Sequence, residues 1–291
     1  LLPLCSGGEL HIAEPAVRSA PAAVLPWLIE HQIEVLHAVP SLSSRWLLDD
    51  SPSVDSLRYT LFAGEPLYGR QVERWRRIAA NTTVINLYGP AETTLAKFHY
   101  QVPMDCGPGL QPVGRPLPDG GFELVPVAPG SGSARRVVIS TPCGSLGYLA
   151  DTCSADDLAR LSRQDGVTRF QTQDRGLLDD DGNLIVAGRL DSLVKRRGTF
   201  VDITRVEEAA ADLAEVRAAC CVQVPASSEI VLVVEGPDPA DAPNLRRRLL
   251  GPLGADLPDR VLVVPSLPLL AGGKADRRGV RDLLNLSGDG S

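Results

Sequence analysis

Short β-type runs alternate with helix-type segments over the first hundred residues, and this alternation restricts the fold more than any other feature. In chain order the segments are a helix at 21–32, the strand IEVLHAV, a helix after Pro40, the strand RYTLFAG, the helix GRQVERWRR and the strand TTVIN. Strands separated by helices usually run parallel, with the helices packed on the sheet faces. The fold class expected is therefore α/β, with a mostly parallel sheet.

The strand spacing shortens between about Gln111 and Gly188, where turn residues divide the sequence into brief apolar runs. The runs are GFELVPV, RRVVIST and NLIVAGR, separated by turns such as PDGG and DDDGN. This spacing is typical of antiparallel β-structure. Asp180-Asp181-Gly182 is a hairpin signal, and we interpret it as a turn and nothing more.

The α/β pattern returns after Arg189. The segments are the strand TFVDIT, the helix RVEEAAADLA, the strands VRAACCVQV and EIVLVVE, the helix NLRRRLLG and the strand RVLVVP. They predict a second, smaller α/β or α+β domain. The expected division is an α/β part at 1–110, a β-rich subdomain at 111–188 and a C-terminal domain at 189–291.

Charge and apolar runs argue against two classes of partner. The 291 residues carry a formal net charge of −7 with scattered basic residues, so no nucleic-acid partner is expected. No apolar run reaches the ~18 residues of a membrane span, and the first residues lack the pattern of a secretory signal. We expect a cytoplasmic protein without a membrane partner.

The six cysteines include no CxxC pair. Their spacing fits neither a zinc site nor a disulfide framework. Free, mostly buried thiols are expected.

The stretch LLAGGKADRR near the end of the chain invites comparison with a phosphate-binding loop. That loop needs Gly, four residues, and then Gly-Lys-Ser/Thr. Here Pro268 stands at the first glycine position and Ala275 at the hydroxyl position, so this interpretation fails. Lys274 is then either a solvated surface charge or a catalytic group delivered from a loop.

The segment NLYGPAETTL (86–95) places an aromatic ring, a Gly-Pro turn, a carboxylate and two hydroxyls at the C-terminal end of a strand. Ligand sites of open α/β sheets lie at such ends. Tyr88 is suited to stack on a base, Glu92 to take a hard cation, and Thr93 or Thr94 to bond a phosphate oxygen. The alternative is a polar loop with Tyr88 packed beneath it.

Five segments in this order, NLYGPAETT, VGRPLPDG, FQTQDRG, GRLDSLVKRRG and GGKADR, form a specific combination. They resemble the adenylate-forming superfamily, and most closely the amino-acid adenylation domains of nonribosomal peptide synthetases. Four of them are similar to the family motifs N-x-Y-G-P-T-E-x-T, Y-x-T-G-D, G-R-x-D-x-x-V-K-x-R-G and, within LPLLAGGKADR, L-P-x-x-x-x-G-K-x-D-R. LLPLCSGGEL and VLHAVPSL also fit, so the resemblance covers nearly the whole chain.

The resemblance implies a partial adenylate-forming fold, with an α/β sheet layer, a small antiparallel β subdomain and a mobile C-terminal α+β domain. It implies that an amino acid carboxylate attacks the α-phosphate of ATP, with Mg²⁺, to give an aminoacyl-adenylate and pyrophosphate. The acyl group then passes to the 4′-phosphopantetheine thiol of a peptidyl carrier protein. A helper protein of the MbtH-like type is a further implied partner.

The resemblance also assigns roles to single residues of this sequence. Glu92 would bind magnesium, Asp191 would be the hinge, and Lys274 would bridge the substrate carboxylate and the phosphate oxygens. Asp276 and Arg277 would shape the turn that carries Lys274. The nucleotide contacts implied are Ala63, Gly64, Glu65, Asn86, Leu87, Tyr88 and Gly89 around adenine, Thr93 and Thr94 at the α-phosphate, and Asp174 and Arg189 at the ribose.

Two further groups of residues follow from the same resemblance. The side-chain pocket of the substrate would be lined by His37, Leu61, Ala63, Leu87, Leu95 and Ala96. All but His37 are apolar, which favours an apolar or modestly polar substrate side chain, and His37 either faces the substrate or fills space beside Pro40. Lys195, Arg197 and Gly198 either line the path of the pantetheine arm or form a basic surface hairpin.

Some parts of the family pattern are missing or changed. The loop ending in P-K-G, and the segment that supplies an aspartate for the substrate ammonium, are absent from this sequence, so we expect it to be the C-terminal portion of the domain. Gln173, Leu193 and Gly272 replace a frequent glycine, glutamine and asparagine, and the run LPDRVLVVPSLP is shorter than usual. Two alternatives stay open, an acyl- or aryl-CoA ligase of the same superfamily and a non-catalytic module that docks a carrier or helper protein.

Overall fold

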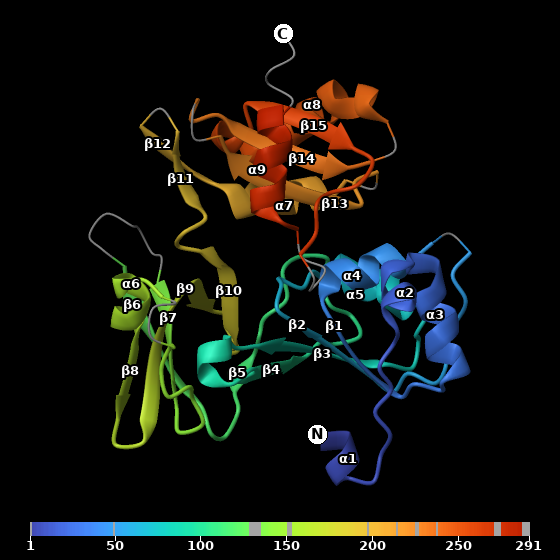
Figure 1. Cartoon of the computed structure of the whole chain (residues 1–291), viewed down its shortest axis with the longest axis vertical. Coiled ribbons are helices and arrows are strands. Elements are labelled where there is room, and N and C mark those ends of the chain that lie inside the picture. Colours follow the sequence, from blue (N-terminus) through green and yellow to red (C-terminus); the bar gives the residue numbers. More distant parts are fainter. Residues whose placement is uncertain are drawn as a thin grey trace. The chain divides into compact units, whose positions relative to one another are not determined.

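The computed structural model describes residues 2–48, 50–127, 135–149, 153–196, 198–213, 215–224, 227–236, 238–270 and 275–286 (Figure 1). Its residues group into two compact units. The first contains Leu1–Phe122, Val138–Gln171 and Leu178–Ile185, and the second contains Glu123–Val137, Thr172–Leu177 and Val186–Ser291. The expected three-way division at 110 and 188 stays a prediction.

The first sheet follows the predicted alternation. Its strands, in the order β1-β2-β3-β4-β5, are β1 (Val35–Ala38), β2 (Tyr59–Ala63), β3 (Thr83–Tyr88), β4 (Phe98–Gln101) and β5 (Arg115–Pro116). Strands β1, β2 and β3 are parallel, as predicted, whereas β4 and β5 add antiparallel pairs that were not predicted. The sheet is thus mixed.

Helices cover one face of this sheet. They are α2 (Pro15–Ser19), α3 (Pro21–Glu30), α4 (Pro40–Trp46) and α5 (Gly69–Arg76), and the short helix α1 (Leu2–Cys5), exposed at residues 3–5, precedes them. Proline opens α2, α3 and α4, where its missing N–H costs no helical hydrogen bond. Phe62 and Val84 point into the core beneath the helices, where Trp75 is fully buried and donates Nε1–H to Thr60 at 3.0 Å.

The predicted antiparallel region forms a second sheet of order β10-β9-β7-β6, with β8 paired to β9. Its elements are β6 (Gly121–Pro126), β7 (Arg135–Thr141), α6 (Ala155–Arg160), β8 (Leu161–Gln164), β9 (Val167–Leu178) and β10 (Leu184–Arg189). The hairpin turn between β9 and β10 is confirmed. Gly182 has φ +78°, and the Asp179 carboxylate accepts the N–H groups of Asp181 and Asn183.

The C-terminal part begins with the hairpin β11 (Leu193–Arg196) and β12 (Thr199–Asp202). It continues with α7 (Ile203–Ala211), β13 (Ala218–Gln223), β14 (Ile230–Glu235), η2 (Pro239–Asp241), α8 (Ala242–Leu253), η3 (Gly254–Asp256), β15 (Arg260–Val264) and α9 (Arg277–Leu286). The sheet order is β13-β14-β15, antiparallel and then parallel. Helix α9 was not predicted.

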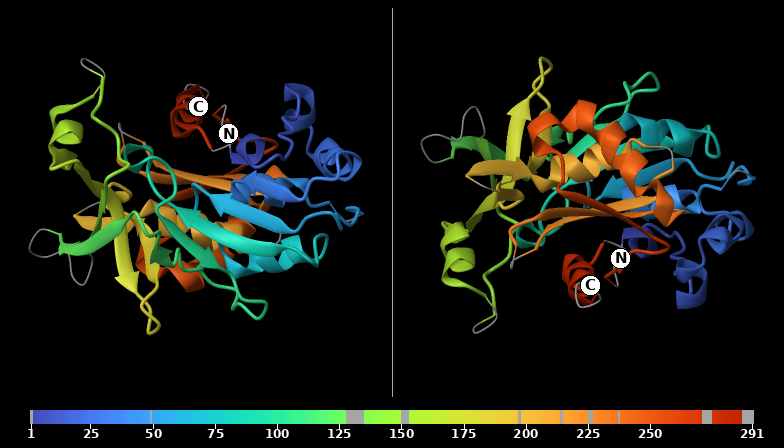
Figure 2. Two further views of the ribbon diagram at one scale, coloured as in Figure 1. Left: turned by 90° about the horizontal axis from the view of Figure 1, so that it is seen from below. Right: turned by 90° about the horizontal axis from the view of Figure 1, so that it is seen from above.

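The C-terminal sheet is covered on both faces (Figure 2). Every residue of β14 is buried, as a central strand between two helix layers requires. Cys221 points into the core formed with α7 and α8, whereas its neighbour Cys220 points into the core formed with α9. The adjacent thiols therefore lie on opposite faces of the sheet.

The cysteine prediction was partly wrong. All six thiols are free, as expected, but only Cys220 and Cys221 are buried. Cys5, at the end of α1, and Cys143, in the turn after β7, are exposed because they lie outside the cores, and Cys106 and Cys153 are partly buried. In the described part of the chain, no helix is long and apolar enough to cross a membrane.

Candidate functional site

A tightly closed loop follows β3. Gly89 is required there, because a Cβ at this position would come within 2.0 Å of the Leu95 carbonyl oxygen. The Lys97 N–H donates to the Tyr88 carbonyl at 2.8 Å and closes the loop. Thr94 (φ +58°) and Leu95 (φ +66°) are both left-handed, although neither is glycine. Consecutive strained residues of this kind concentrate at functional sites.

The carboxylate of Glu92 lies within this loop and is held by a tyrosine. Tyr148 donates its hydroxyl to Glu92 Oε1 at 2.7 Å, and the Ser145 N–H donates to the Glu92 carbonyl at 2.8 Å. Thr94 Oγ1 donates to the Cys143 carbonyl. Burial and the bond to Glu92 raise the pKa of Tyr148, which keeps its proton available for donation. Segment 143–148 thus supports the loop.

Several predicted nucleotide contacts also fix the backbone. Thr93 is fully buried and donates to the Pro90 carbonyl at 3.0 Å. Asn86 is buried and donates to the Pro112 carbonyl at 2.8 Å. Glu65 accepts both the N–H and the hydroxyl of Ser41, each at 2.9 Å, at the start of α4. These side chains stabilise the walls around the predicted nucleotide site.

The predicted pocket residues share one face of the first sheet. Strand pairing aligns His37 with Leu61, and Ala63 with Leu87. They alternate with the core residues beneath the helices, so they lie on the opposite, less buried face. Gly64, with φ +84°, turns the chain just after Ala63.

Three further predicted contacts of the first unit lie at the end of β3 or in the loop that follows it. Leu95 is 76% exposed and Ala96 is half-buried. Tyr88, at the end of β3, stacks at an angle on Phe98, with ring centroids 5.6 Å apart.

In the second unit, three predicted residues form one charged cluster. Arg189 makes a two-pronged pair with Asp191, at 2.7 Å from Nε and 2.6 Å from Nη2. The same guanidinium approaches Asp174 at 3.5 Å. The structure therefore brings the predicted ribose contacts and the predicted hinge residue together.

Residues missed by the sequence analysis support this cluster. Asp202 accepts the hydroxyl of Ser192 at 2.8 Å, the N–H of Thr204 at 3.1 Å and the guanidinium of Arg175. The Leu190 N–H donates to the Gln173 carbonyl at 2.6 Å. The aspartate of TFVDIT caps α7 through Thr204, but its other partners, Ser192 and Arg175, lie in distant segments and leave no sign in the sequence.

Lys274 falls outside the described residues, and so does Arg197. Two residues after Lys274, the Asp276 carboxylate accepts the N–H groups of Arg278 and Gly279 and caps α9, and its turn-shaping role stays a prediction. The Arg277 side chain pairs with Glu207 on α7 at 2.7 Å, and its turn-shaping role stays a prediction.

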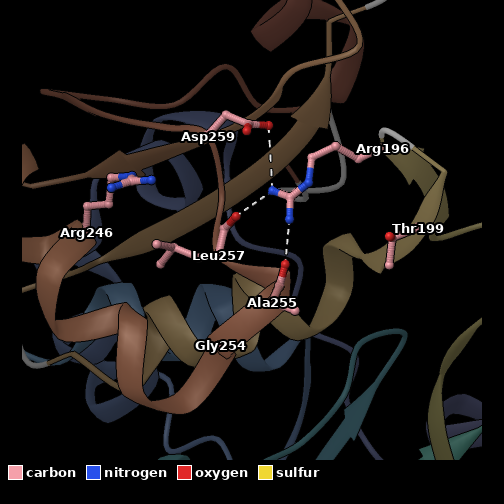
Figure 3. A pocket seen from close by; sticks show the side chains of 7 residues that line it. All are labelled: Arg196, Thr199, Arg246, Gly254, Ala255, Leu257 and Asp259. Atoms are coloured by element: carbon pink, nitrogen blue, oxygen red, sulfur yellow. Dashed lines mark hydrogen bonds and ion pairs between the residues drawn. The ribbon is translucent and has the colours of Figure 1, made fainter.

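An open pocket of about 340 Å³ lies in the C-terminal domain, lined by Arg196, Thr199, Arg246, Gly254, Ala255, Leu257 and Asp259 (Figure 3). Its arginine Arg196 donates to the carbonyls of Ala255 and Leu257, the latter at 2.6 Å, and lies 3.6 Å from the Asp259 carboxylate. These contacts fasten the β11–β12 hairpin to the segment after α8, so Arg196 has a structural role here.

Lys97 is another residue that sequence reasoning missed. Its side chain is 5% exposed and its ammonium lies 2.6 Å from Asp119. That hydrogen bond lowers the pKa of Asp119. One sign of its importance is visible in the sequence, because Lys97 directly follows the predicted apolar pocket residues Leu95 and Ala96.

Comparison with known proteins adds family information. The family model described as AMP-binding enzyme matches residues 1–149. The chain is 28% identical over 263 residues to the hybrid PKS-NRPS synthetase TAS1 of Gloeophyllum trabeum, covering 86% of this chain and 16% of that protein. It is 26% identical over 295 residues to surfactin synthase subunit 2 of Bacillus subtilis, covering 95% of this chain and 8% of that protein.

Two solved structures have similar folds. The crystal structure of IdnL7 has a TM-score of 0.75 at 28% identity, covering 95% of this chain and 55% of that one. AB3403, a four-domain nonribosomal peptide synthetase bound to AMP and glycine, has a TM-score of 0.76 at 22% identity, covering 96% of this chain and 21% of that one. The chain thus spans about half of IdnL7 and a small part of the synthetases. By the family match, the mixed α/β fold and the strand-end loop, this chain belongs to the family of AMP-binding enzymes.

Proposed function

We propose that the protein containing this chain activates an amino acid with ATP as its aminoacyl-adenylate and transfers the acyl group to the phosphopantetheine thiol of a carrier protein. The observation that carries the proposal is the strained loop that holds Glu92 directly after β3, a strand whose Leu87 shares one sheet face with His37, Leu61 and Ala63. Similarity to peptide synthetases supports this choice of substrate and acceptor.

The nucleotide would be held by residues from two groups. Tyr88 offers an aromatic ring for adenine at the end of β3, and Asp174 offers a carboxylate that accepts hydrogen bonds from ribose hydroxyls. Arg189 already approaches Asp174, so it is suited to join the same contact. Ala63, Gly64 and the backbone of Glu65 complete the proposed adenine surroundings.

Magnesium fits the proposed site through Glu92. In the described part of the chain, no group of three or more His, Cys, Asp and Glu residues could hold a metal by itself. Magnesium bound together with a nucleotide takes one or two carboxylates and completes its shell with phosphate oxygens and water. A single carboxylate oriented by Tyr148 meets that need, and the ion would supply charge neutralisation at the phosphates.

The substrate side chain would lie on the less buried face of the first sheet. His37, Leu61, Ala63 and Leu87 carry no negative charge there, and Leu95 and Ala96 are the proposed additional contacts. An apolar or modestly polar amino acid suits this lining better than a basic one.

Lys274 is proposed to bridge the substrate carboxylate and the phosphate oxygens during adenylate formation. Asp191 is proposed as the hinge that turns the C-terminal domain between the two half-reactions. Lys195, Arg197 and Gly198 are proposed to line the pantetheine path, and the MbtH-like helper remains a predicted partner.

The test of this function is ATP–pyrophosphate exchange with a panel of amino acids, using the full-length protein that contains the chain. Exchange with an amino acid, followed by loading of that acid onto a carrier protein, supports the proposal. Loading of coenzyme A with an aryl or acyl acid would instead favour a CoA ligase. Carrier binding without exchange for any acid would favour a docking module.

Lys274→Ala provides the sharper mechanistic prediction. The variant should lose adenylate formation by about 100-fold or more, because a charge at the reacting phosphate stabilises the transition state. Transfer from a preformed adenylate to the carrier thiol should stay at the wild-type rate. Equal loss in both half-reactions would contradict the proposed role of the lysine.

A further inference from the structure

The base of the loop that carries Lys274 is anchored on both sides by carboxylates of the C-terminal domain. Leu269 and Ala275 form an isolated antiparallel bridge, and the Asp276 N–H donates to the Pro268 carbonyl at 2.8 Å. These contacts bring the two ends of the loop together. The proposed function gives the loop its importance, and the following inference rests on it.

The upstream anchor is Glu235, the last residue of β14. Its side chain is buried, and Oε2 accepts the N–H of Leu267 at 3.1 Å. Arg217 lies 3.7 Å from the same carboxylate and donates to the Pro265 carbonyl at 3.2 Å. The chain entering the loop is therefore bonded to the central strand of the domain.

The downstream anchor joins three elements through Glu207 on α7. The Glu207 carboxylate accepts Arg277 Nη1 at 2.7 Å and Nη2 at 2.8 Å, a two-pronged pair, and also accepts the Cys221 N–H at 2.6 Å. Arg277 Nη1 in turn donates to the Cys221 carbonyl at 2.6 Å. Helix α7, strand β13 and the first residue of α9 are thus linked by one network.

Packing reinforces this network at the start of α9. Val280 and Leu267 share the core on the α9 face of the sheet. A Cβ at Gly279 would approach the Pro268 Cβ to 3.0 Å, so the two segments are in close contact. The planar guanidinium of Arg277 allows few orientations when both nitrogens are bonded. The ends of the loop therefore have a defined position on the domain.

We propose that Glu207 is a positioning residue for Lys274. Through Arg277, three residues after the lysine, Glu207 fixes where the chain rejoins the domain, and we expect the catalytic contribution of Lys274 to depend on that attachment point. Glu235 does the same for the incoming chain. Neither carboxylate needs to touch substrate, because a displacement of about 1 Å at a reacting centre is enough to lower the rate 100-fold.

The test is Glu207→Gln in the full-length protein, with both half-reactions measured. Glutamine keeps the size of the side chain but removes the charge that orients Arg277. We expect kcat of adenylate formation to fall about 10- to 100-fold, with KM for ATP nearly unchanged. Thiol transfer from a preformed adenylate should be unaffected. Arg277→Lys, which keeps a positive charge without the two-pronged geometry, should cause a smaller loss in the same half-reaction.

A double-variant comparison separates positioning from general stability. In a Lys274→Ala background, Glu207→Gln should lower adenylate formation no further, because the group that it positions is absent. The matched control is Glu215→Gln, which removes another carboxylate paired with an arginine of this domain, Arg248, and should leave both half-reactions unchanged.

Three results would overturn the inference in a protein whose wild type is active. They are a fully active Glu207→Gln variant, equal loss in both half-reactions, and an effect that adds to that of Lys274→Ala. If Glu207→Gln does not fold, Arg277→Lys decides by the same comparisons. A wild-type protein without exchange for any acid would instead refute the proposed function.

Discussion

Tyr148 shows how a single hydroxyl controls a proposed metal ligand. It holds one oxygen of Glu92 at 2.7 Å, and the surrounding backbone ties the segment of Tyr148 to the same loop through Ser145. A carboxylate without this donor would sample several rotamers, and a bound cation would have to order it. The tyrosine therefore lowers the cost of binding the ion.

Tyr148→Phe tests this role. We expect the magnesium concentration for half-maximal adenylate formation to rise about 10-fold, which is typical of losing a group that orients a metal ligand. Magnesium titration of ATP–pyrophosphate exchange measures the effect. Tyr100→Phe is the control, because Tyr100 packs against the helix-covered core. An unchanged magnesium dependence in Tyr148→Phe would contradict the proposed orienting role of Tyr148.

Gly89→Ala tests the tight closure of the loop. The added methyl group would collide with the Leu95 carbonyl oxygen, a backbone atom that cannot turn away. We expect a loss of about 1–3 kcal/mol in the free energy of unfolding, measured by urea denaturation. Gly121→Ala, where the new Cβ meets open space, should cost much less. Equal costs would mean that the loop opens freely.

Local patterns in the sequence predicted helices and strands better than they predicted the contacts between them. The apolar run of β14 and the amphipathic pattern of α5 indicated those elements directly, because burial on two faces or one gives a distinct periodicity. Strand β9 was hidden, since its buried positions are partly threonines such as Thr172, which bonds the Val137 carbonyl at 2.8 Å. Because threonine is polar, a strand that buries threonines has a sequence similar to that of a loop.

Long-range pairs left no sequence signal at all. Tyr148 and Glu92 are 56 residues apart, and Glu207 and Arg277 are 70 residues apart. Each pair depends on the packing of elements whose arrangement follows from the whole fold. The motif residues themselves were recognised, but their supporting partners required the structure.

Helix α4 is held at its start by a distant side chain. Glu65 accepts two hydrogen bonds from Ser41 in the first turn of the helix, where backbone N–H groups lack helical partners. Glu65→Ala should lower the free energy of unfolding by about 0.5–2 kcal/mol without ATP, as loss of a cap does. Glu73→Ala, at an exposed ion pair on α5, should change it by less than about 0.5 kcal/mol. Similar losses in both variants would contradict the capping role.

At the scale of the whole molecule, the C-terminal domain has the features of an independent folding unit. Its two cores, one with α7 and α8 and one with α9, draw their buried residues from Val201 to Leu284 alone. Contact between neighbouring segments also favours rapid folding.

Expression of residues 190–291 tests this independence. The fragment should unfold in one cooperative transition on heating, monitored by far-UV circular dichroism because its only aromatic residue is the exposed Phe200. Broad unfolding together with binding of a hydrophobic dye at neutral pH would show instead that the fragment needs the rest of the chain.

The adjacent cysteines of β13 allow thiol labelling to probe the two helix layers of the C-terminal domain separately. Burial raises the pKa of Cys220 to about 12 and that of Cys221 well above its ordinary value, so neither thiol reacts while the layers stay closed. Alkylation of Cys220 would therefore record departure of α9, and alkylation of Cys221 departure of α7 and α8. In the fragment 190–291, which contains no other cysteine, Cys220→Ala and Cys221→Ala each leave one thiol, and the labelling rates give the order in which the two sides open.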